Sequence, residues 1–475
     1  MDVHSHLDNQ VVEQSARPKP FGMKDKVGYA LGDLANNLTF VISAVFLLKF
    51  YTDVMGISAE LVGLMMLLSK VVDAFTDVTM GQLVDRSQPK AKGKFSPWLL
   101  RMSGPIAVAT VLLFPVWFTH MPMGFKIFWM FFSYLLWGSV CYTGINIPYG
   151  SMASAISSDP IDRTSLSSWR TIGATVGIMV VGVILPLFVF YKEPNGHTVL
   201  SSEHLAIGAI ICAFLMVGCY LGCYFMCTER VKVKKLTVKF SLTKLLSSLI
   251  HDRALIGIVL SSLLLLVTQL SLTGTGAYIY PNYFGNVSAF SIATFLGVII
   301  TFAFTPFVVK LSQWFGKKEI SVLSSLVSTV SLFALYWLHT HNIYVWFVFY
   351  AIGYIGIAIF TLVCWAMITD VIDANELSTH QREDGTVYSL YSFFRKIGQA
   401  LASGLTGIML SVVGYSSTTA FSPNVVDGIY DITCLIPAVS SLAFVLVLWF
   451  LYPLNKKAVA RNVDALRRFR ANNDA

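Results

Sequence analysis

The sequence predicts an all-α integral membrane protein in which twelve membrane-spanning helices form two six-helix halves. Three observations lead to this fold class. The chain is 55% hydrophobic and only 13% charged, with a mean hydropathy of +0.66, whereas an average soluble protein carries about 25% charged residues. Apolar runs of the length that crosses a bilayer as a helix recur along the 475 residues. Lysines and arginines gather in alternate loops between these runs.

The apolar runs define the expected spans. They lie at 28–51, 60–84, 98–119, 125–156, 168–190, 204–227, 254–280, 288–310, 320–338, 343–369, 386–414 and 429–452. An even number of spans leaves both termini on the same side of the membrane. The longer runs are expected to tilt or to extend beyond the hydrocarbon layer.

Basic residues give the orientation. They cluster before the first span, after the second, between the sixth and seventh, after the eighth and in the C-terminal tail. Loops on the other side contribute only Lys126 and Lys192. Because the basic side of a multi-pass protein faces the cytoplasm, we expect a cell-membrane protein with both termini inside. The same distribution explains the net charge of +8 without nucleic acid as a partner.

The longest inner loop divides the chain. We expect a cytoplasmic N-terminal segment, a six-helix bundle, a polar and basic linker, a second six-helix bundle and a cytoplasmic tail, at 1–26, 27–227, 228–253, 254–453 and 454–475. A weak internal repeat supports the division, since the loops at 81–94 and 310–318 share a pattern of basic residues and glycine. Two such halves with a site between them at mid-membrane are typical of a transporter.

Three ionisable side chains lie inside the second apolar run, in the stretch Ser69–Asp77. An Asp or Lys at the centre of a membrane helix costs about 2.5–3.5 kcal/mol, so each needs a partner or a use. Asp73 and Asp77 are one turn apart and share a helix face, with Lys70 on the same side. Two converging carboxylates make a site for a small cation or a proton. The alternative is a buried ion pair in which Lys70 neutralises one Asp and only fixes helix packing.

Polar residues in the first and fourth spans are further candidates. Asp33 and Asn37 share a face of the first span. The amides of Asn36 and Asn37 suit sugar hydroxyls or, alternatively, hydrogen bonds between helices. In the fourth span, Thr143 is placed to lend its hydroxyl to a cation held by the carboxylates, and Asn146 lies on a compatible face.

Arg170 opens the fifth span, where it either snorkels to the inner interface or pairs with a carboxylate or hydroxyl in a cavity. Lys396 lies too deep in its run to reach the surface easily, so it either binds sugar hydroxyls or balances the two carboxylates. Asp370 and Asp373 end the tenth span and are expected to cap a cytoplasmic network. Further residues expected to contact the substrate are Thr361, Trp365 and Ser392.

No enzyme motif accompanies these residues. The sequence has no P-loop, no H-E-x-x-H motif and no paired-cysteine cluster, so we expect neither an ATPase nor a zinc enzyme. No cofactor is expected beyond a transported H⁺ or Na⁺. The seven cysteines fall in or at the ends of apolar runs and are interpreted as packing residues.

Four motifs occur in a characteristic order: Tyr51–Gly56, Asp73–Gly81, Gly93–Trp98 and Asn146–Tyr149. Together they resemble the glycoside-pentoside-hexuronide:cation symporter family, which includes melibiose permease and the lactose and xyloside permeases. The resemblance covers essentially the whole chain. It implies the major facilitator superfamily fold and the uptake of a sugar together with Na⁺, Li⁺ or H⁺.

The resemblance also implies site residues. Asp73 and Asp77 match cation-binding carboxylates, which would hold Na⁺ if that is the ion, and Thr143 matches a cation-site hydroxyl. Thr76 stands where the family has Asn, which leaves both H⁺ and Na⁺ open. Residues that align with sugar-pocket positions are Arg170, Ser392 and Lys396. A gating motif at the cytoplasmic ends of the helices comprises Gly81, Asp85, Arg86, Lys94, Asp370 and Asp373.

Substrate specificity is expected to differ from that of melibiose permease. That protein has charged pocket residues where this chain has Asn36, Asn37 and Asn146, and tryptophans where it has Gly150 and Thr361. Loss of carboxylates and aromatic rings implies a differently shaped pocket. The pocket residues are closer to those of xyloside permeases, so we favour a xyloside or another pentose-containing glycoside.

These inferences combine in a secondary-active symporter that imports a glycoside with H⁺ or Na⁺ by alternating access. A cation at the two carboxylates would remove their repulsion and favour a sugar-competent cavity, so each ligand would raise the affinity for the other. One rival keeps the fold but is an uncoupled facilitator or exchanger of glycosides. A more distant rival is a non-transporting membrane sensor or enzyme, although the sequence offers neither a signalling domain nor a catalytic constellation.

Overall fold

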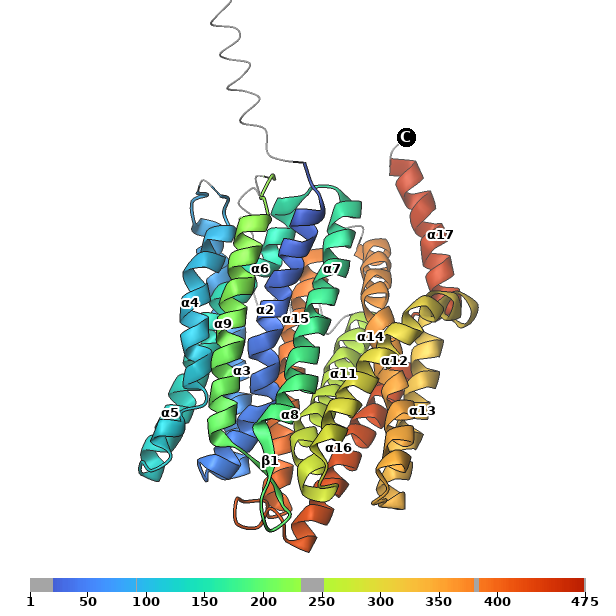
Figure 1. Ribbon diagram of the computed structural model, residues 1–475. Coiled ribbons are helices and arrows are strands. Elements are labelled where there is room, and N and C mark those ends of the chain that lie inside the picture. Colours follow the sequence, from blue (N-terminus) through green and yellow to red (C-terminus); the bar gives the residue numbers. More distant parts are fainter. Residues whose placement is uncertain (1–19, 91, 232–251, 380–383, 474–475) are drawn as a thin grey trace, which may run out of the picture.

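The chain folds into a bundle of long helices that run between two faces of the molecule (Figure 1). The computed structural model describes residues 20–90, 92–231, 252–379 and 384–473. The described chain begins and ends at one face, which we call the terminal face. A short antiparallel hairpin of β1 (Phe190–Lys192) and β2 (Thr198–Leu200) lies at the other, which we call the opposite face (Figure 1).

The first half consists of six rods, some of which contain a π-helical turn. These rods are α2 (Met23–Lys49) with η1 (Phe50–Val54), α3 (Ala59–Arg86), α4 (Ser96–Leu112), α5 (Met123–Leu135) with η3 (Leu136–Tyr142) and α6 (Thr143–Ile156), α7 (Pro160–Met179) with η4 (Val180–Ile184) and α8 (Leu185–Val189), and α9 (Ser202–Met226). A short 3₁₀ turn, η2 (Val116–Phe118), follows α4.

The second half also has six rods: α11 (Arg253–Tyr278) with η5 (Ile279–Tyr283), α12 (Val287–Phe315), α13 (Lys317–Leu338), α14 (Ile343–Thr379), α15 (Asp384–Val412) and α16 (Pro423–Phe450). A further helix, α17 (Lys456–Asn473), continues from the last rod at the terminal face (Figure 1).

Each of the twelve predicted runs coincides with one rod of the described chain, so the predicted fold class is confirmed. Nine rods of the described chain are long and apolar enough to cross a bilayer. The others are α3, α4 and α15. Helix α4 has only 17 residues, and α3 and α15 carry charged residues inside their apolar runs. This architecture is that of a multi-pass membrane protein, as predicted.

Two elements were not predicted. The β1–β2 hairpin adds two short strands to the all-α expectation, because the loop between α8 and α9 folds back on itself through a turn at Gly196. Helix α17 forms within the tail predicted at 454–475. The predicted segment 1–26 and linker 228–253 lie largely outside the described residues, so their boundaries stay predictions.

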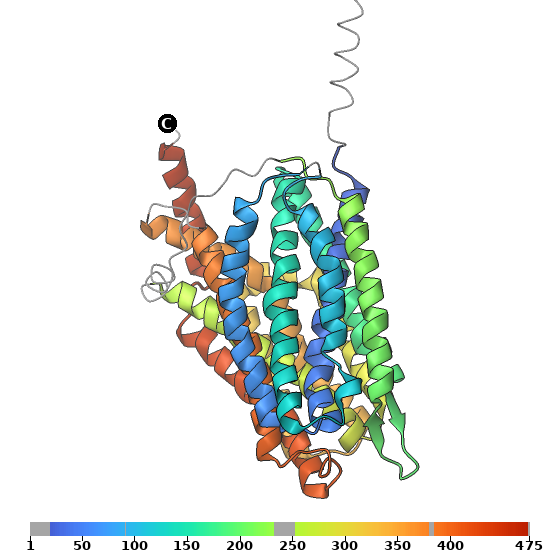
Figure 2. The ribbon, with the colours of Figure 1, turned by 90° about the vertical axis from the view of Figure 1, so that its left-hand side faces the viewer.

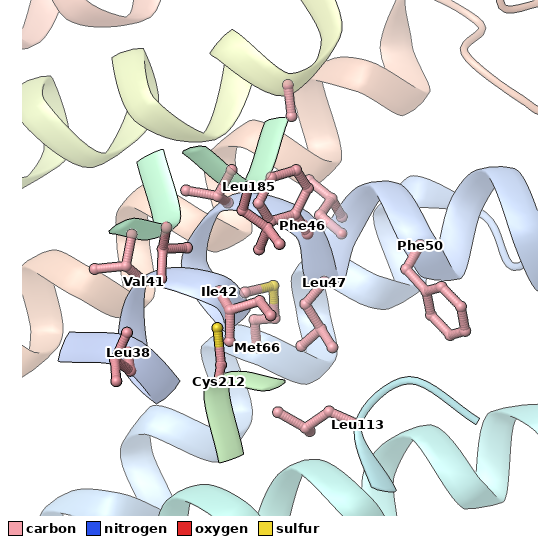
Figure 3. Packing of buried hydrophobic residues seen from close by; sticks show 14 of the residues in the cluster. Leu38, Val41, Ile42, Phe46, Leu47, Phe50, Met66, Leu113, Leu185 and Cys212 are labelled. Atoms are coloured by element: carbon pink, nitrogen blue, oxygen red, sulfur yellow. The ribbon is translucent and has the colours of Figure 1, made fainter. Parts of the chain in front are cut away.

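Buried apolar side chains around α2 form much of the core. Leu38, Ile42 and Phe46 follow one another at one-turn spacing and pack against neighbouring helices (Figure 3). On the outer faces, large apolar side chains such as Phe214 and Trp337 stay more than three-quarters exposed. Such exposed apolar faces are typical of helices that lie against lipid.

The two halves meet where α3 lies along α15 and where α2 contacts α11, and α12 adds a contact with η4. Figure 2 shows the bundle from the side of the first half. Glycine permits the close approach of α3 and α15. A methyl group on Gly407 would lie 2.5 Å from the carbonyl oxygen of Ala59 and 2.7 Å from Cα of Gly63. Because Ala59 begins α3, this tight contact closes the bundle toward the opposite face.

Candidate functional site

The two carboxylates of α3 are held by the rod that contains η3 and α6. Ser139 Oγ donates to Asp73 Oδ1 at 2.5 Å, and Thr143 Oγ1 donates to Asp77 Oδ1 at 2.7 Å. The two hydroxyls are four residues apart, as are the two carboxylates, so one contact lies a turn above the other. At Gly138 an added methyl group would lie 3.2 Å from Asp73 Oδ1, which shows how closely the rods approach.

Each carboxylate is also paired with a lysine. Lys70 Nζ lies 2.8 Å from Asp73 Oδ2 within the same helix. Lys396 Nζ, from α15 of the other half, pairs with Asp77 Oδ2. The pairing of Lys70 considered in the sequence analysis is therefore present. The second carboxylate has its own lysine, so two negative and two positive groups face one another.

The two pairs differ in exposure. The side chains of Lys70 and Asp73 are 8% and 5% exposed, whereas those of Lys396 and Asp77 are 23% and 19% exposed. The Lys70–Asp73 pair is therefore almost fully buried, whereas the Lys396–Asp77 pair is partly exposed. Thr76, predicted to contact a cation, donates its hydroxyl to the backbone oxygen of Asp73 at 3.1 Å. This contact uses the hydroxyl hydrogen within α3, and the oxygen keeps its lone pairs.

A second polar group surrounds Asp33 of α2. Arg170 Nε lies 3.0 Å from Asp33 Oδ1, and the Asn37 amide donates to the backbone oxygen of Asp33 at 2.9 Å. The Arg170 guanidinium also lies over the Tyr149 ring, 5.6 Å from its centroid. Of the two interpretations of Arg170, the structure shows the pairing with a carboxylate. Its side chain remains 41% exposed, so part of the guanidinium can reach a ligand.

The other amides of the first half have different surroundings. Asn36 is buried and accepts a hydrogen bond from Tyr220 OH at 2.7 Å, while its Nδ2 has no partner among the described residues. The contact with Tyr220 joins α2 to α9. Asn146 is half-buried on α6, one turn beyond Thr143.

The candidates in the second half are only partly brought together. Lys396 reaches the carboxylates, whereas Thr361 uses its hydroxyl on the backbone oxygen of Ile357 at 2.7 Å. Trp365 is about half-exposed and stands edge-on to Tyr391 of α15, with ring centroids 5.1 Å apart. Ser392 is exposed. Thr361, Trp365 and Ser392 are therefore accessible but do not touch the carboxylates.

The predicted gating residues form ion pairs in both halves. Lys94 Nζ lies 3.2 Å from Asp85 Oδ1, and Lys317 Nζ lies 2.7 and 2.8 Å from the two oxygens of Asp370. Arg86 is exposed, and Gly81 and Asp373 are half-buried. The first pair joins the end of α3 to the loop that follows it, and the second joins the start of α13 to α14, so each half has a Lys–Asp pair at the terminal face.

Glu229, which follows α9, was missed in the sequence. Its carboxylate accepts the backbone N–H groups of Lys94, Phe95 and Ser96 at 2.6–2.9 Å, and the Ser96 hydroxyl at 2.8 Å. These groups stand at the start of α4, where backbone donors lack partners within the helix. The contact fastens the beginning of the predicted linker to the first half.

A charged cluster at the opposite face was also missed. Lys49 Nζ lies 3.0 Å from Asp53 Oδ2 and donates to Asn282 Oδ1 at 3.2 Å and to Tyr415 OH at 3.1 Å. Tyr415 OH donates in turn to Asp53 Oδ1 at 2.7 Å. The ammonium also lies 4.5 Å from the ring centroid of Tyr278. We call these five residues the opposite-face cluster; it joins the two halves.

Tyr415 lies in the loop after α15. Burial, together with the neighbouring Asp53 carboxylate, raises the pKa of its phenol well above the usual value. The phenol therefore stays protonated at physiological pH and keeps donating to Asp53.

An internal sequence repeat marks the opposite-face cluster. Tyr51–Gly56 after α2 and Tyr280–Gly285 after α11 share Tyr, then Asp53 or Asn282 two residues later, then Gly at the end. Both turns are π-helical, and the final glycines have positive φ angles of 71° and 58°. Equivalent turns of the two halves therefore face each other.

A small cavity lies between the halves, between the carboxylates and the opposite-face cluster. Its volume is about 30 Å³, and its lining includes Ser43, Lys70, Trp137 and Gln399. One or two water molecules fill such a volume, so in this conformation the cavity is too small for a sugar ring.

Comparison with known proteins agrees with this architecture. Residues 28–456 match the family model described as MFS/sugar transport protein. The chain is 30% identical over 470 residues to the uncharacterized symporter YjmB of Bacillus subtilis (strain 168), covering 98% of this chain and 100% of that protein. It is 31% identical over 434 residues to the glucuronide carrier protein homolog of Escherichia coli (strain K12), covering 91% and 92% of the two chains.

The fold is also found in a solved transporter structure. The nucleoside transporter NupG superposes with a TM-score of 0.65 at 15% sequence identity, covering 91% of this chain and 100% of that chain. At that identity the likeness concerns the fold alone. The family match spans nearly all of both halves, including both charged pairs. The chain therefore belongs to the MFS/sugar transport protein family.

Proposed function

We propose that the protein is a secondary-active symporter of the cell membrane, which imports a glycoside together with H⁺ or Na⁺ by alternating access. The Asp77–Lys396 ion pair carries the proposal, because it takes one residue from each half. Any motion that separates α3 from α15 at this level must break the pair. The charge state of Asp77 is thereby linked to the conformation of the bundle.

The remaining polar groups are assigned to the sugar. Arg170, Asn37 and Asn146 lie in the first half, and Lys396 becomes a free donor once a proton or cation neutralises Asp77. Sugar binding and cation binding then favour the same state, which couples the two ligands. An uncoupled facilitator would need neither the shared pair nor its exposure.

The proposal also assigns each face of the molecule to one side of the membrane. The terminal face is assigned to the cytoplasm, in keeping with the basic residues near it. The α3–α15 contact and the opposite-face cluster close the other side. The conformation described here is then the inward-facing one.

A xyloside or another pentose-containing glycoside is the first substrate to test, on the strength of the pocket residues noted in the sequence. A glucuronide is the second. It is favoured by the likeness to a glucuronide carrier homolog and by the exposed part of Arg170, since a guanidinium binds a carboxylate with two parallel hydrogen bonds.

The experiment is uptake of labelled xylosides and glucuronides into membrane vesicles with an imposed Na⁺ gradient, an imposed pH gradient, or neither. Accumulation above equilibrium that follows one gradient is the expected result. Equilibration that ignores both gradients would leave a facilitator. No uptake of any sugar, in vesicles where the protein is folded and inserted, would contradict the proposal.

A further inference from the structure

Lys70 holds its ammonium group where a metal ion bound to Asp73 would stand. Its Nζ lies 2.8 Å from Asp73 Oδ2 and 5.7 and 5.6 Å from the ring centroids of Tyr134 and Trp137. A carboxylate and two aromatic faces are the surroundings that a buried monovalent cation prefers. Lys70 is only 8% exposed, so its ammonium group depends on these neighbours and on the small cavity that it lines.

Each oxygen of the two carboxylates already has one positively charged or hydrogen-bonding partner. Asp73 accepts from Ser139 and Lys70, and Asp77 accepts from Thr143 and Lys396. A Na⁺ ion at these oxygens would therefore compete with the two ammonium groups for the same carboxylates. The two carboxylates and two ammonium groups also sum to zero charge. At an effective dielectric constant of about 20, one ammonium about 4 Å away weakens the binding of a further cation about a thousandfold.

The two lysines differ in how they are attached to the carboxylates. Lys396 reaches Asp77 from the other half, so in the proposed transport cycle this pair would break and form again. Lys70 is three residues before Asp73 in the same helix and moves with it. Neutralisation of Asp73 is therefore present in every conformation in which α3 is intact.

We propose that Lys70 is a tethered cation that permanently replaces a metal ion at Asp73, so that the protein does not bind Na⁺ or Li⁺. The inference rests on the proposed function and narrows it, because it removes Na⁺ from the two coupling ions considered above. The cavity beside Lys70, about 30 Å³ in volume, leaves room for an ion with a water molecule once the ammonium group is removed.

The test is ion binding by the purified, detergent-solubilised protein, measured as ²²Na⁺ binding and as the shift of Tm when Na⁺ or Li⁺ replaces choline. Wild type should show neither binding nor a shift. Lys70→Met removes the charge and shortens the side chain by one heavy atom, so it should bind Na⁺ or Li⁺ at least about a hundredfold more tightly than wild type. Adding Asp73→Asn should abolish this gained binding.

Two controls separate the inference from other effects. Lys94→Met removes a buried lysine from a different Lys–Asp pair and should gain no Na⁺ binding. The binding assay uses no sugar, so its result can be interpreted even if the vesicle experiment shows no sugar transport. Na⁺ binding by wild type that Asp73→Asn abolishes would overturn the inference, even if Lys70→Met fails to fold. Folded, monodisperse Lys70→Met protein that binds no Na⁺ or Li⁺ would also overturn it.

Discussion

Lys396 of α15 pairs with Asp77 of α3, whereas the neighbouring Lys70–Asp73 pair lies within α3 alone. Separation of the halves therefore breaks the Lys396–Asp77 pair and leaves the Lys70–Asp73 pair intact. The side chains of the pair between the halves are also the more exposed, as expected for groups that exchange partners with a ligand.

Asp77→Asn should uncouple transport. The substitution leaves the Lys396 ammonium without its counter-charge and removes the group whose charge changes with the coupling ion. We expect accumulation against a gradient to fall about tenfold or more, equivalent to about 1.4 kcal/mol of coupling free energy. Sugar exchange down a gradient should persist. Vesicle uptake with and without preloaded sugar measures both, and Asp427→Asn, at an exposed site on the opposite face, is the control.

Arg170→Lys should weaken sugar binding. The lysine keeps the positive charge but loses the planar fork that contacts Asp33 and lies over Tyr149. Loss of one charge-assisted hydrogen bond, worth about 1.5 kcal/mol, would raise the apparent KM about tenfold. Initial rates of uptake over a range of sugar concentrations measure this. An unchanged KM would place Arg170 outside the sugar site.

Gly407→Ala should destabilise the contact between the halves. Its added methyl group would lie 2.5 Å from the carbonyl oxygen of Ala59, so α3 and α15 must separate. We expect a loss of about 1–3 kcal/mol of stability, typical of overpacking. Gly104→Ala is the matched control, since Gly104 lies within α4 with no heavy atom within 4 Å of an added methyl group. Thermal unfolding in detergent should separate the two variants.

Lys49→Met should open the opposite face. Among the described residues, Asp53 then keeps only the Thr52 and Tyr415 hydroxyls as donors. Removing one partner of a buried ion pair costs about 3–5 kcal/mol. A cysteine introduced by Ser43→Cys, in the lining of the central cavity, should then react faster with a membrane-impermeant maleimide added from that side. Tyr415→Phe should have the same effect in milder form. Equal labelling rates in all variants would mean that the cluster does not hold this face closed.

Glu229→Ala should destabilise the first half more than Glu229→Gln does. Alanine leaves the backbone donors at the start of α4 without an acceptor, whereas glutamine keeps one acceptor oxygen. Leaving such donors unsatisfied costs about 1–3 kcal/mol. Thermal unfolding measures the difference, with Glu203→Ala in the exposed first turn of α9 as the control. Identical Tm values for the alanine and glutamine variants would contradict this role.

Hydrophobic runs and helix periodicity determined much of the fold in advance. Each span is a local property of about twenty residues, so the twelve rods and the shared face of Lys70, Asp73 and Asp77 are predictable from the chain alone. The same is true of the lysine–aspartate pair within α3, because three-residue spacing brings those side chains together in any helix.

Only the tertiary structure decided which residues meet across long stretches of the chain. Asp77 meets Lys396, Lys49 meets Asn282, and Glu229 reaches the start of α4, each across more than one hundred residues of chain. No local pattern specifies such contacts, because they depend on how two six-helix halves pack against each other. The sequence by itself thus determined which charges lie in the membrane, and the packing of the halves decided that each carboxylate of α3 already has a lysine.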